Sequence, residues 1–336
     1  MNKIKEIMPG FLVCLGIALL SKSIALLLPT LGAATFAIFI GIFLGNTIFK
    51  GDIYNKGSKF SESELLAYSV VLMGATLNLS DIASVGVKGV LFIILQMILT
   101  ITATYMIGRR LKFTKKFSLL MGTGNAVCGS SAIAAVAPVV DSEPKDRALS
   151  ITMVNITGTI LMFVLPLLAS FLYNHELFQT SGLIGGILQS VGQVIASAKF
   201  VNDSVVEMST IFKIIRIILL VVVVIVFSKF NTTEGEKLFS KKESTEVKGK
   251  IKVSIPWFVT GFFIVSIINT LGIIPVSVAH TAKFISGQFE IIALAAIGMR
   301  VKFKDLKEEG PKSMLYGLLV GACQIIFAVT LIRVLF

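Results

Sequence analysis

The chain has 336 residues, of which 55% are hydrophobic and only 15% are charged, and its formal net charge is +12. About a quarter of the residues in a soluble domain are charged, so this composition excludes an ordinary soluble domain. In so apolar a chain, basic residues are first expected to mark the cytoplasmic side of a membrane. We therefore expect a lipid bilayer around the protein and no nucleic-acid partner.

Long apolar segments follow one another along the whole chain. A bilayer-spanning helix needs about 20 mostly apolar residues. About eleven segments meet this requirement, at 8–29, 32–49, 62–79, 86–108, 117–140, 147–173, 180–199, 205–228, 253–272, 277–299 and 313–335. The sequence thus predicts an all-α polytopic membrane protein of about 11 transmembrane helices. The spans 117–140 and 180–199 are the least apolar, and the count changes if either is a re-entrant hairpin.

The loop charges predict the orientation. Basic residues gather at the N-terminus and after the second, fourth, eighth and tenth spans, which the positive-inside rule assigns to the cytoplasm. The N-terminus is then cytoplasmic and the C-terminus outside, in the inner (cytoplasmic) membrane of the cell. Residues 1–228 form the N-terminal membrane half, and 253–336 form the C-terminal membrane segment. The polar segment 229–252 has mixed charge and is expected to be a flexible cytoplasmic linker.

Two segments resemble each other. Residues 70–91 and 294–315 align without a gap and are identical at Gly74/Gly298, Asp81/Asp305, Gly86/Gly310, Lys88/Lys312 and Leu91/Leu315. Their predicted orientations are opposite, which is typical of inverted-topology transporters. The alternative is chance similarity between two pairs of helices. Gly74 and Gly298 are expected to permit close helix packing, and Asp81 and Asp305 to cap helices rather than to bind a coupling ion.

The motif GTGNAVCGSSAIAA at 122–135 is the strongest candidate for a site. Its glycines weaken a continuous helix, and a broken backbone at membrane depth must be buried in protein or line a wet cavity. We expect a discontinuous helix in which Ser130 or Ser131 caps a second half, whose N-terminus suits an anion. Candidate substrate-binding residues are Gly124, Asn125, Gly129, Ser130 and Ser131. The alternative is plain packing of small residues.

Two further groups of polar residues stand in apolar segments. Gln189 and Gln193 are four apart, so on one helix they share a face that points to the first motif or to water. Interhelical hydrogen bonding without a substrate is the alternative. Lys213 and Arg216 share a face three residues apart. Cations at this depth are costly, so they either take part in an anion site or snorkel to the membrane surface.

Acidic residues near these cations are few. Glu207 pairs with Lys213 only if the helix bends. Glu290 lies inside the tenth span and is the candidate for ion coupling. It carries a proton, or it pairs with Lys213, Arg216 or Lys283; a plain ion pair between helices is the alternative.

Several classes of chemistry find no support. The chain has no GxxxxGK[ST] phosphate loop, which argues against ATP-driven work. It has only two histidines and three scattered cysteines, so no cofactor and no metal site are predicted. Cys128 is a candidate nucleophile only for an intramembrane enzyme, and no histidine or acid lies near it in sequence. A small packing residue is the favoured interpretation, and no catalytic residue is assigned.

At these residues the chain resembles the YeiH-like family of bacterial membrane proteins, which carries the name of sulfate exporters. The resemblance depends on TGNAVCGSSAIAAVAPV at 123–139, FKIIRIILL at 212–220, PWFVTGFF and NTLGIIP within 256–275, and ALAAIGMRVKFKDL and GPK within 293–312. The family is similar in pattern to inverted-repeat carriers of the bile-acid-symporter and sodium–proton-antiporter type. This implies discontinuous core helices, with Asn125, Ser130, Ser131, Gln193, Lys213 and Arg216 in or near a core cavity. A His–Glu pair of the family pattern is replaced here by Gln189 and Ser190, which argues against the same proton coupling.

The predicted function is secondary transport of a small anion, with sulfate or an organic sulfonate suspected, by alternating access. The alternatives are a channel, a membrane scaffold without transport, and an intramembrane enzyme that uses Cys128. The expected partners are a small anionic substrate and the lipid bilayer, with a homodimer as an open option.

Overall fold

A computed structural model describes residues 2–27, 32–77, 80, 83, 85–236, 238, 256–302 and 310–336. Every regular element in these ranges is helical. Among the described residues, six helices are long and apolar enough to cross a membrane by length and composition, at Ile4–Leu27, Gly86–Arg110, Pro144–Tyr173, Asp203–Ser228, Val276–Arg300 and Pro311–Leu335. Three shorter apolar helices lie at Ala33–Thr47, Leu177–Ile187 and Trp257–Thr270. The all-α prediction is confirmed, whereas the count of about eleven crossings stays a prediction.

The chain divides into two compact units. The first comprises Met1–Ser84, Ile195–Glu207 and Pro256–Lys304, and the second comprises Val85–Val194, Met208–Ile255 and Asp305–Phe336. This division differs from the predicted halves, because each unit is built from three separate stretches of sequence.

The first unit contains α1 (Asn2–Leu27), α2 (Ala33–Thr47), η1 (Asp52–Tyr54), α3 (Asn55–Phe60), η2 (Ser61–Leu65), α4 (Leu66–Met73), α14 (Trp257–Thr270) and α15 (Val276–Arg300). Helices α2 and α15 touch through their backbones, because a Cβ at Gly41 would lie 2.5 Å from the Ala295 carbonyl and one at Gly298 would overlap the Ile38 carbonyl. A Cβ at Gly74 would lie 2.7 Å from the Phe262 carbonyl. The prediction of close packing at Gly74 and Gly298 is therefore confirmed.

Asp81 and Asp305 lie outside the described residues, so their predicted capping role is not seen. The same holds for part of each copy in the proposed repeat.

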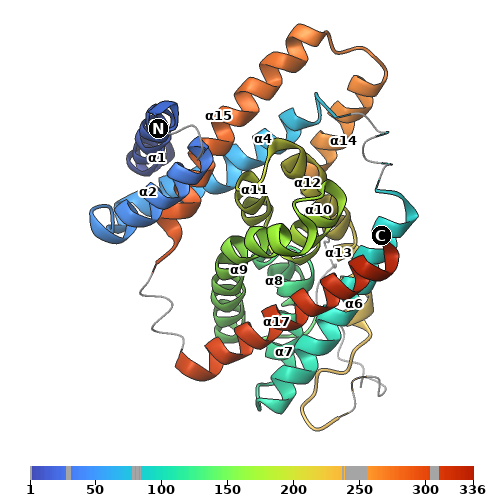
Figure 1. The fold of residues 1–336 in the computed structure, drawn as a ribbon. Helices are drawn as coiled ribbons and strands as arrows, with labels where there is room; N and C mark the ends of the chain where they lie inside the picture. Colours follow the sequence, from blue (N-terminus) through green and yellow to red (C-terminus); the bar gives the residue numbers. More distant parts are fainter. Residues whose placement is uncertain are drawn as a thin grey trace. The chain divides into compact units, whose positions relative to one another are not determined.

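The second unit carries the predicted site motifs. It contains α6 (Gly86–Arg110), α7 (Lys115–Ala126), α8 (Ser130–Val136), α9 (Pro144–Tyr173), α10 (Leu177–Ile187), α13 (Leu220–Ser228) and α17 (Gly310–Leu335), while α11 (Val191–Lys199) and α12 (Asp203–Ile218) contribute to both units. Helix α6 packs against α7 and α17 (Figure 1). The Tyr316 hydroxyl of α17 donates to the Thr104 carbonyl of α6 at 2.7 Å, and the Tyr316 ring stacks on Phe113 at 5.1 Å. These contacts tie α17 to the start of α7.

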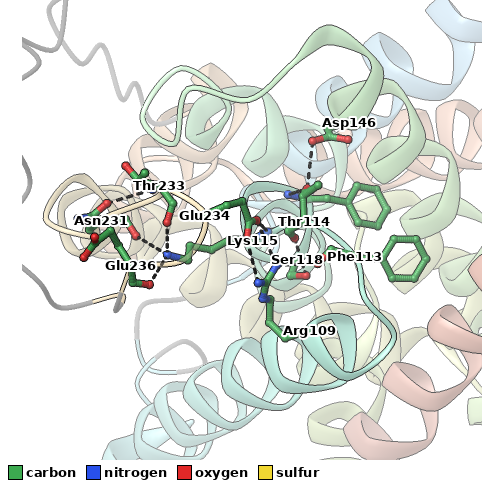
Figure 2. A network of polar contacts seen from close by, with 11 residues as sticks. Arg109, Phe113, Thr114, Lys115, Ser118, Asp146, Asn231, Thr233, Glu234 and Glu236 are labelled. Carbon is green, nitrogen blue, oxygen red and sulfur yellow. Dashed lines mark hydrogen bonds and ion pairs between the residues drawn. The ribbon is translucent and has the colours of Figure 1, made fainter.

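The start of α7 is held by the loop that follows α13. Figure 2 shows the Lys115 ammonium among three carbonyls of this loop, and it donates to Thr233 at 2.6 Å, Glu236 at 2.8 Å and Asn231 at 3.2 Å. Glu234 accepts from Arg109 at 2.8 Å and also from the backbone N–H of Lys115. We call residues 231–236 the latch. The predicted flexible linker thus begins with a segment that packs on α7, and residues 237 and 239–252 lie outside the described residues.

Candidate functional site

The helix break predicted within the motif at 122–135 is present. Helix α7 ends at Ala126 and α8 begins at Ser130, with Gly129 at a φ of 68° between them. A residue with a side chain rarely adopts this backbone conformation, so glycine is the residue that suits it. The prediction that Ser130 or Ser131 caps α8 is wrong, because Gly129 holds the N-cap position and no side chain caps the helix. Ser130 and Ser131 are both exposed.

A second break lies between α10, which ends at Ile187, and α11, which begins at Val191. The Gln193 backbone N–H donates to Ser190 Oγ at 3.1 Å, and the Ser190 N–H donates to Gln193 Oε1 at 3.0 Å. This reciprocal pair is a capping box, which satisfies backbone donors at the start of α11. Gln189 and Gln193 therefore do not share the face of one continuous helix. Gln189 lies in the break and Gln193 in the first turn of α11.

The two breaks lie against each other. A Cβ at Gly129 would lie 3.7 Å from Cβ of Gln189. The Gln189 amide also donates to Asn125 Oδ1 at 3.0 Å. Of the two alternatives, the first motif or water, Gln189 faces the first motif, whereas Gln193 contacts Asn155 and Ser190.

Lys213 of α12 points into this junction. Its ammonium donates to the carbonyls of Val127, Gln189 and Leu188, the last at 2.8 Å. The residue is fully buried. The last carbonyls of a helix have no partner within the helix and carry its negative end. Lys213 therefore satisfies the C-terminal ends of α7 and α10 together.

Arg216 lies one turn further along α12 and also donates to carbonyls at the C-terminal ends of α7 and α10. Its Nε donates to the Ala126 carbonyl at 2.9 Å, and its two terminal nitrogens donate to Asn125 at 2.8 Å, Leu188 at 2.9 Å and Gly185 at 3.1 Å. The side chain is 1% exposed. Snorkelling to the membrane surface is therefore wrong for both cations. Within the described ranges no carboxylate lies within 4.0 Å of either one.

Buried amide side chains also lie around the junction of the two breaks. Gln324 of α17 is fully buried and donates to the Asn125 carbonyl at 3.0 Å, and it accepts from the Gln189 amide at 3.4 Å. The amide groups of Gln189 and Gln193 both pack against Gly158 of α9, where a Cβ would overlap them. Sequence reasoning missed Gln324. The signal for it was a lone polar residue in the last apolar span, 199 residues from Asn125.

Gly124 packs inside α7, where a Cβ would lie 2.8 Å from Ile133 Cδ1 of α8 and 2.9 Å from Val154 of α9. It therefore shapes the site through close packing rather than through a polar group. Cys128 lies in the first break and is partly exposed. No group of three or more His, Cys, Asp and Glu side chains in the described ranges is placed to hold a metal ion.

Glu290 belongs to the first unit and pairs with a cation that sequence reasoning did not consider. Its Oε2 lies 3.0 Å from the Lys199 ammonium, which also contacts Asp203 at 2.7 Å. Ser286 Oγ lies 3.3 Å from Glu290 Oε1. Pairing of Glu290 with Lys213, Arg216 or Lys283 is therefore wrong. Ion coupling through Glu290 stays a prediction, beside the alternative of a plain ion pair that this geometry shows.

Glu207 also has a partner other than the one considered. It pairs with Lys283 at 3.2 Å and not with Lys213.

An apolar cavity of about 220 Å³ lies between α9 and α17, lined in part by Thr157, Leu161, Gly317 and Gly321. It contains no charged side chain, and neither buried cation lines it.

A model of the family described as Conserved hypothetical protein 698 matches residues 9–317. The chain belongs to this family. It is similar to a UPF0324 membrane protein of Clostridium perfringens, with 58% identity over 334 residues, 99% of this chain and 98% of the relative. It is also similar to a UPF0324 membrane protein of Lactiplantibacillus plantarum, with 45% identity over 335 residues and 99% of both chains.

The family therefore consists of membrane proteins, and the resemblance drawn from the sequence motifs is confirmed. Among solved structures, the chain is similar to the sodium proton antiporter of Methanocaldococcus jannaschii, with 13% identity, a TM-score of 0.29, and coverage of 97% of this chain and 99% of that one. A TM-score this low carries no inference about the fold.

Proposed function

We propose that this membrane protein is a secondary transporter of a small anion. The observation that carries the proposal is the pair of fully buried cations, Lys213 and Arg216, at the junction of two interrupted helices. A cation inside a membrane protein is costly and marks a substrate or ion pathway. Interrupted helices at membrane depth are typical of transporter sites. Positive charge without a neighbouring carboxylate favours an anion over a cation as the substrate.

The anion binds beside the two breaks, within the electrostatic influence of the cations but without direct contact with them. Lys213 makes three hydrogen bonds to carbonyls and Arg216 makes four, so seven of their eight N–H donors are already used. The exposed hydroxyls of Ser130 and Ser131 and the remaining amide N–H of Gln193 supply the polar contacts. Gln189 already donates to Asn125 and Gln324 and holds these residues in place beside the anion. Sulfate or an organic sulfonate is the proposed substrate, as the resemblance of the sequence motifs to the YeiH-like proteins implies.

The proposed topology has about eleven crossings in the inner (cytoplasmic) membrane, with the N-terminus cytoplasmic and the C-terminus outside. Segments 70–91 and 294–315 belong to inverted repeats. Alternating access then exposes the site first to one side of the membrane and then to the other.

Purified protein in liposomes, loaded with unlabelled sulfate, tests the proposal through uptake of labelled sulfate, with protein-free liposomes as the blank. We expect saturable uptake that falls at least about tenfold in Lys213→Gln, equivalent to about 1.4 kcal/mol. The matched control is Lys88→Gln, because Lys88 is exposed at the start of α6. Absence of uptake for sulfate, sulfonates and other small anions would overturn the proposal. Single-channel currents without saturation would show a channel instead.

A further inference from the structure

Seven of the eight N–H donors of Lys213 and Arg216 are satisfied, but the charges of the two residues are not neutralised. All seven hydrogen bonds that they make end on backbone carbonyl oxygens, from Asn125, Ala126, Val127, Gly185, Leu188 and Gln189. A carbonyl is a dipole with no net charge. Hydrogen bonding therefore removes the cost of an unmet donor and leaves two positive charges in place.

The helix ends offset these charges only in part. The C-terminal end of a helix carries about half a negative charge, so α7 and α10 contribute about −1 in total. The starts of α8 and α11 lie at the same breaks and have the opposite sign. The neighbouring Asn125, Gln189, Gln193 and Gln324 are neutral amides. The junction thus keeps a net charge between about +1 and +2.

In a carrier that works by alternating access, this net charge affects the free energy of the closed state. Between the two open states the site is closed to both sides, so dissolved anions cannot screen it. Buried charge without a counter-charge is strongly unfavourable at low dielectric constant. A bound anion provides the counter-charge, and an empty site has none. The loaded carrier can therefore close, while the empty carrier meets a higher barrier.

We propose that Lys213 and Arg216 make this protein an anion exchanger, in which one anion must leave for another to enter. This inference rests on the proposed transport function and adds its mode. The two residues act as fixed positive charges that raise the free energy of the closed, empty site. The empty carrier therefore changes more slowly between its two open states than the loaded carrier. A monovalent or divalent anion matches the charge of the junction.

The test compares two internal solutions in liposomes that contain the full-length protein. One set holds unlabelled sulfate and the other holds gluconate of equal ionic strength, and valinomycin with equal potassium on both sides removes any membrane potential. Uptake of labelled sulfate is then measured. We expect at least tenfold faster uptake into sulfate-loaded liposomes. Equal initial rates in the two sets would overturn the exchange inference and leave transport itself intact. Absence of uptake in both sets would overturn the transport proposal, and the exchange inference with it.

Neutral variants test whether the two cations cause the effect. In Lys213→Gln with Arg216→Gln, assayed with labelled sulfate raised until uptake by the variant is measurable, the ratio between the rates for the two loadings should fall toward one, because the empty site no longer carries charge. The matched control, Lys88→Gln with Arg110→Gln, changes two exposed residues of α6 and should keep the wild-type ratio. If the neutral double variant does not fold, Lys213→Gln alone should show a smaller ratio than Lys88→Gln alone. An unchanged ratio in the neutral variants that do fold would refute the role of the cations.

Discussion

Arg216→Gln is the most informative substitution, because electrostatics and structure predict different outcomes. An anion about 7 Å from the guanidinium, at an effective dielectric constant of about 20, gains about 2 kcal/mol per unit of its charge. Loss of the Arg216 charge should therefore weaken a monovalent anion about thirtyfold and a divalent anion about a thousandfold. A larger loss of affinity for the divalent anion than for the monovalent anion therefore identifies an effect of charge.

The fold should tolerate the change. Leu188 and Asn125 keep other donors, from Lys213 and Gln324, so two carbonyls lose their side-chain partner. Each unmet carbonyl costs about 1–3 kcal/mol. Removal of a buried charge recovers several kcal/mol of desolvation, which offsets that cost.

The assay is competition against labelled sulfate uptake by unlabelled sulfate, which is divalent, and by methanesulfonate, which is monovalent and similar in shape. Arg216→Lys keeps the charge and should keep the wild-type preference between the two anions. Arg110→Gln, at the exposed end of α6, should change neither affinity. Equal fold losses for the two anions in Arg216→Gln would refute the electrostatic reasoning, as would an identical preference in Arg216→Lys and Arg216→Gln.

Three further substitutions test the surroundings of the site. In Gly158→Ala the new Cβ overlaps the Gln189 amide, so we expect uptake to fall at least about tenfold while the protein still folds with a melting temperature lower by several degrees, since overpacking costs about 1–3 kcal/mol; unchanged uptake would contradict a role for the amide cluster. Gln324→Leu keeps the volume and removes the side chain's hydrogen bonds with Asn125, Ile187 and Gln189; if the site loses about 1 kcal/mol of these, the KM for sulfate should rise about fivefold at an unchanged yield of folded protein. In the latch, burial raises the pKa of Glu234, but its hydrogen bonds and attraction to Lys115 and to the nearby arginine outweigh burial and lower the pKa overall. Since the lowered value belongs to the folded state, the latch should be present at neutral pH and weaken as pH falls through that pKa. Hydrogen exchange of residues 231–236 measures this, and Glu234→Gln should be less protected at neutral pH and lose the pH dependence; full protection in that variant would show that the carboxylate is not needed.

Much of the fold follows from the sequence because hydropathy and helix breaks are local properties. The apolar segments predicted at 86–108 and 147–173 correspond to α6 and α9 within a few residues. The break near Gly129 follows from three closely spaced glycines that weaken the helix. The break at Leu188–Ser190 was not predicted, because the spacing of Gln189 and Gln193 was interpreted on one continuous helix. A local signal was present, since Ser190 and Gln193 have the spacing of the capping box that begins α11.

The sequence could not predict which side chains contact each other. Glu290 pairs with Lys199 and not with any of the cations considered, although both residues were visible in the sequence. The direction of a side chain depends on how its helix is rotated against its neighbours, and that rotation is set by packing across the unit. Gln324 shows the same limit, since its contact with Asn125 joins residues 199 positions apart.

The sequence by itself determined that this is a helical membrane protein, where one helix breaks, and which cations stand within apolar segments. It did so because the bilayer imposes a length and a polarity on each short segment. Only the tertiary structure decided what Lys213 and Arg216 contact. They meet carbonyls from two breaks that lie 24 to 91 residues away along the chain, and no local pattern records such a meeting. That arrangement placed seven of the eight N–H donors of the two cations on backbone carbonyls, which their positions in the sequence do not reveal.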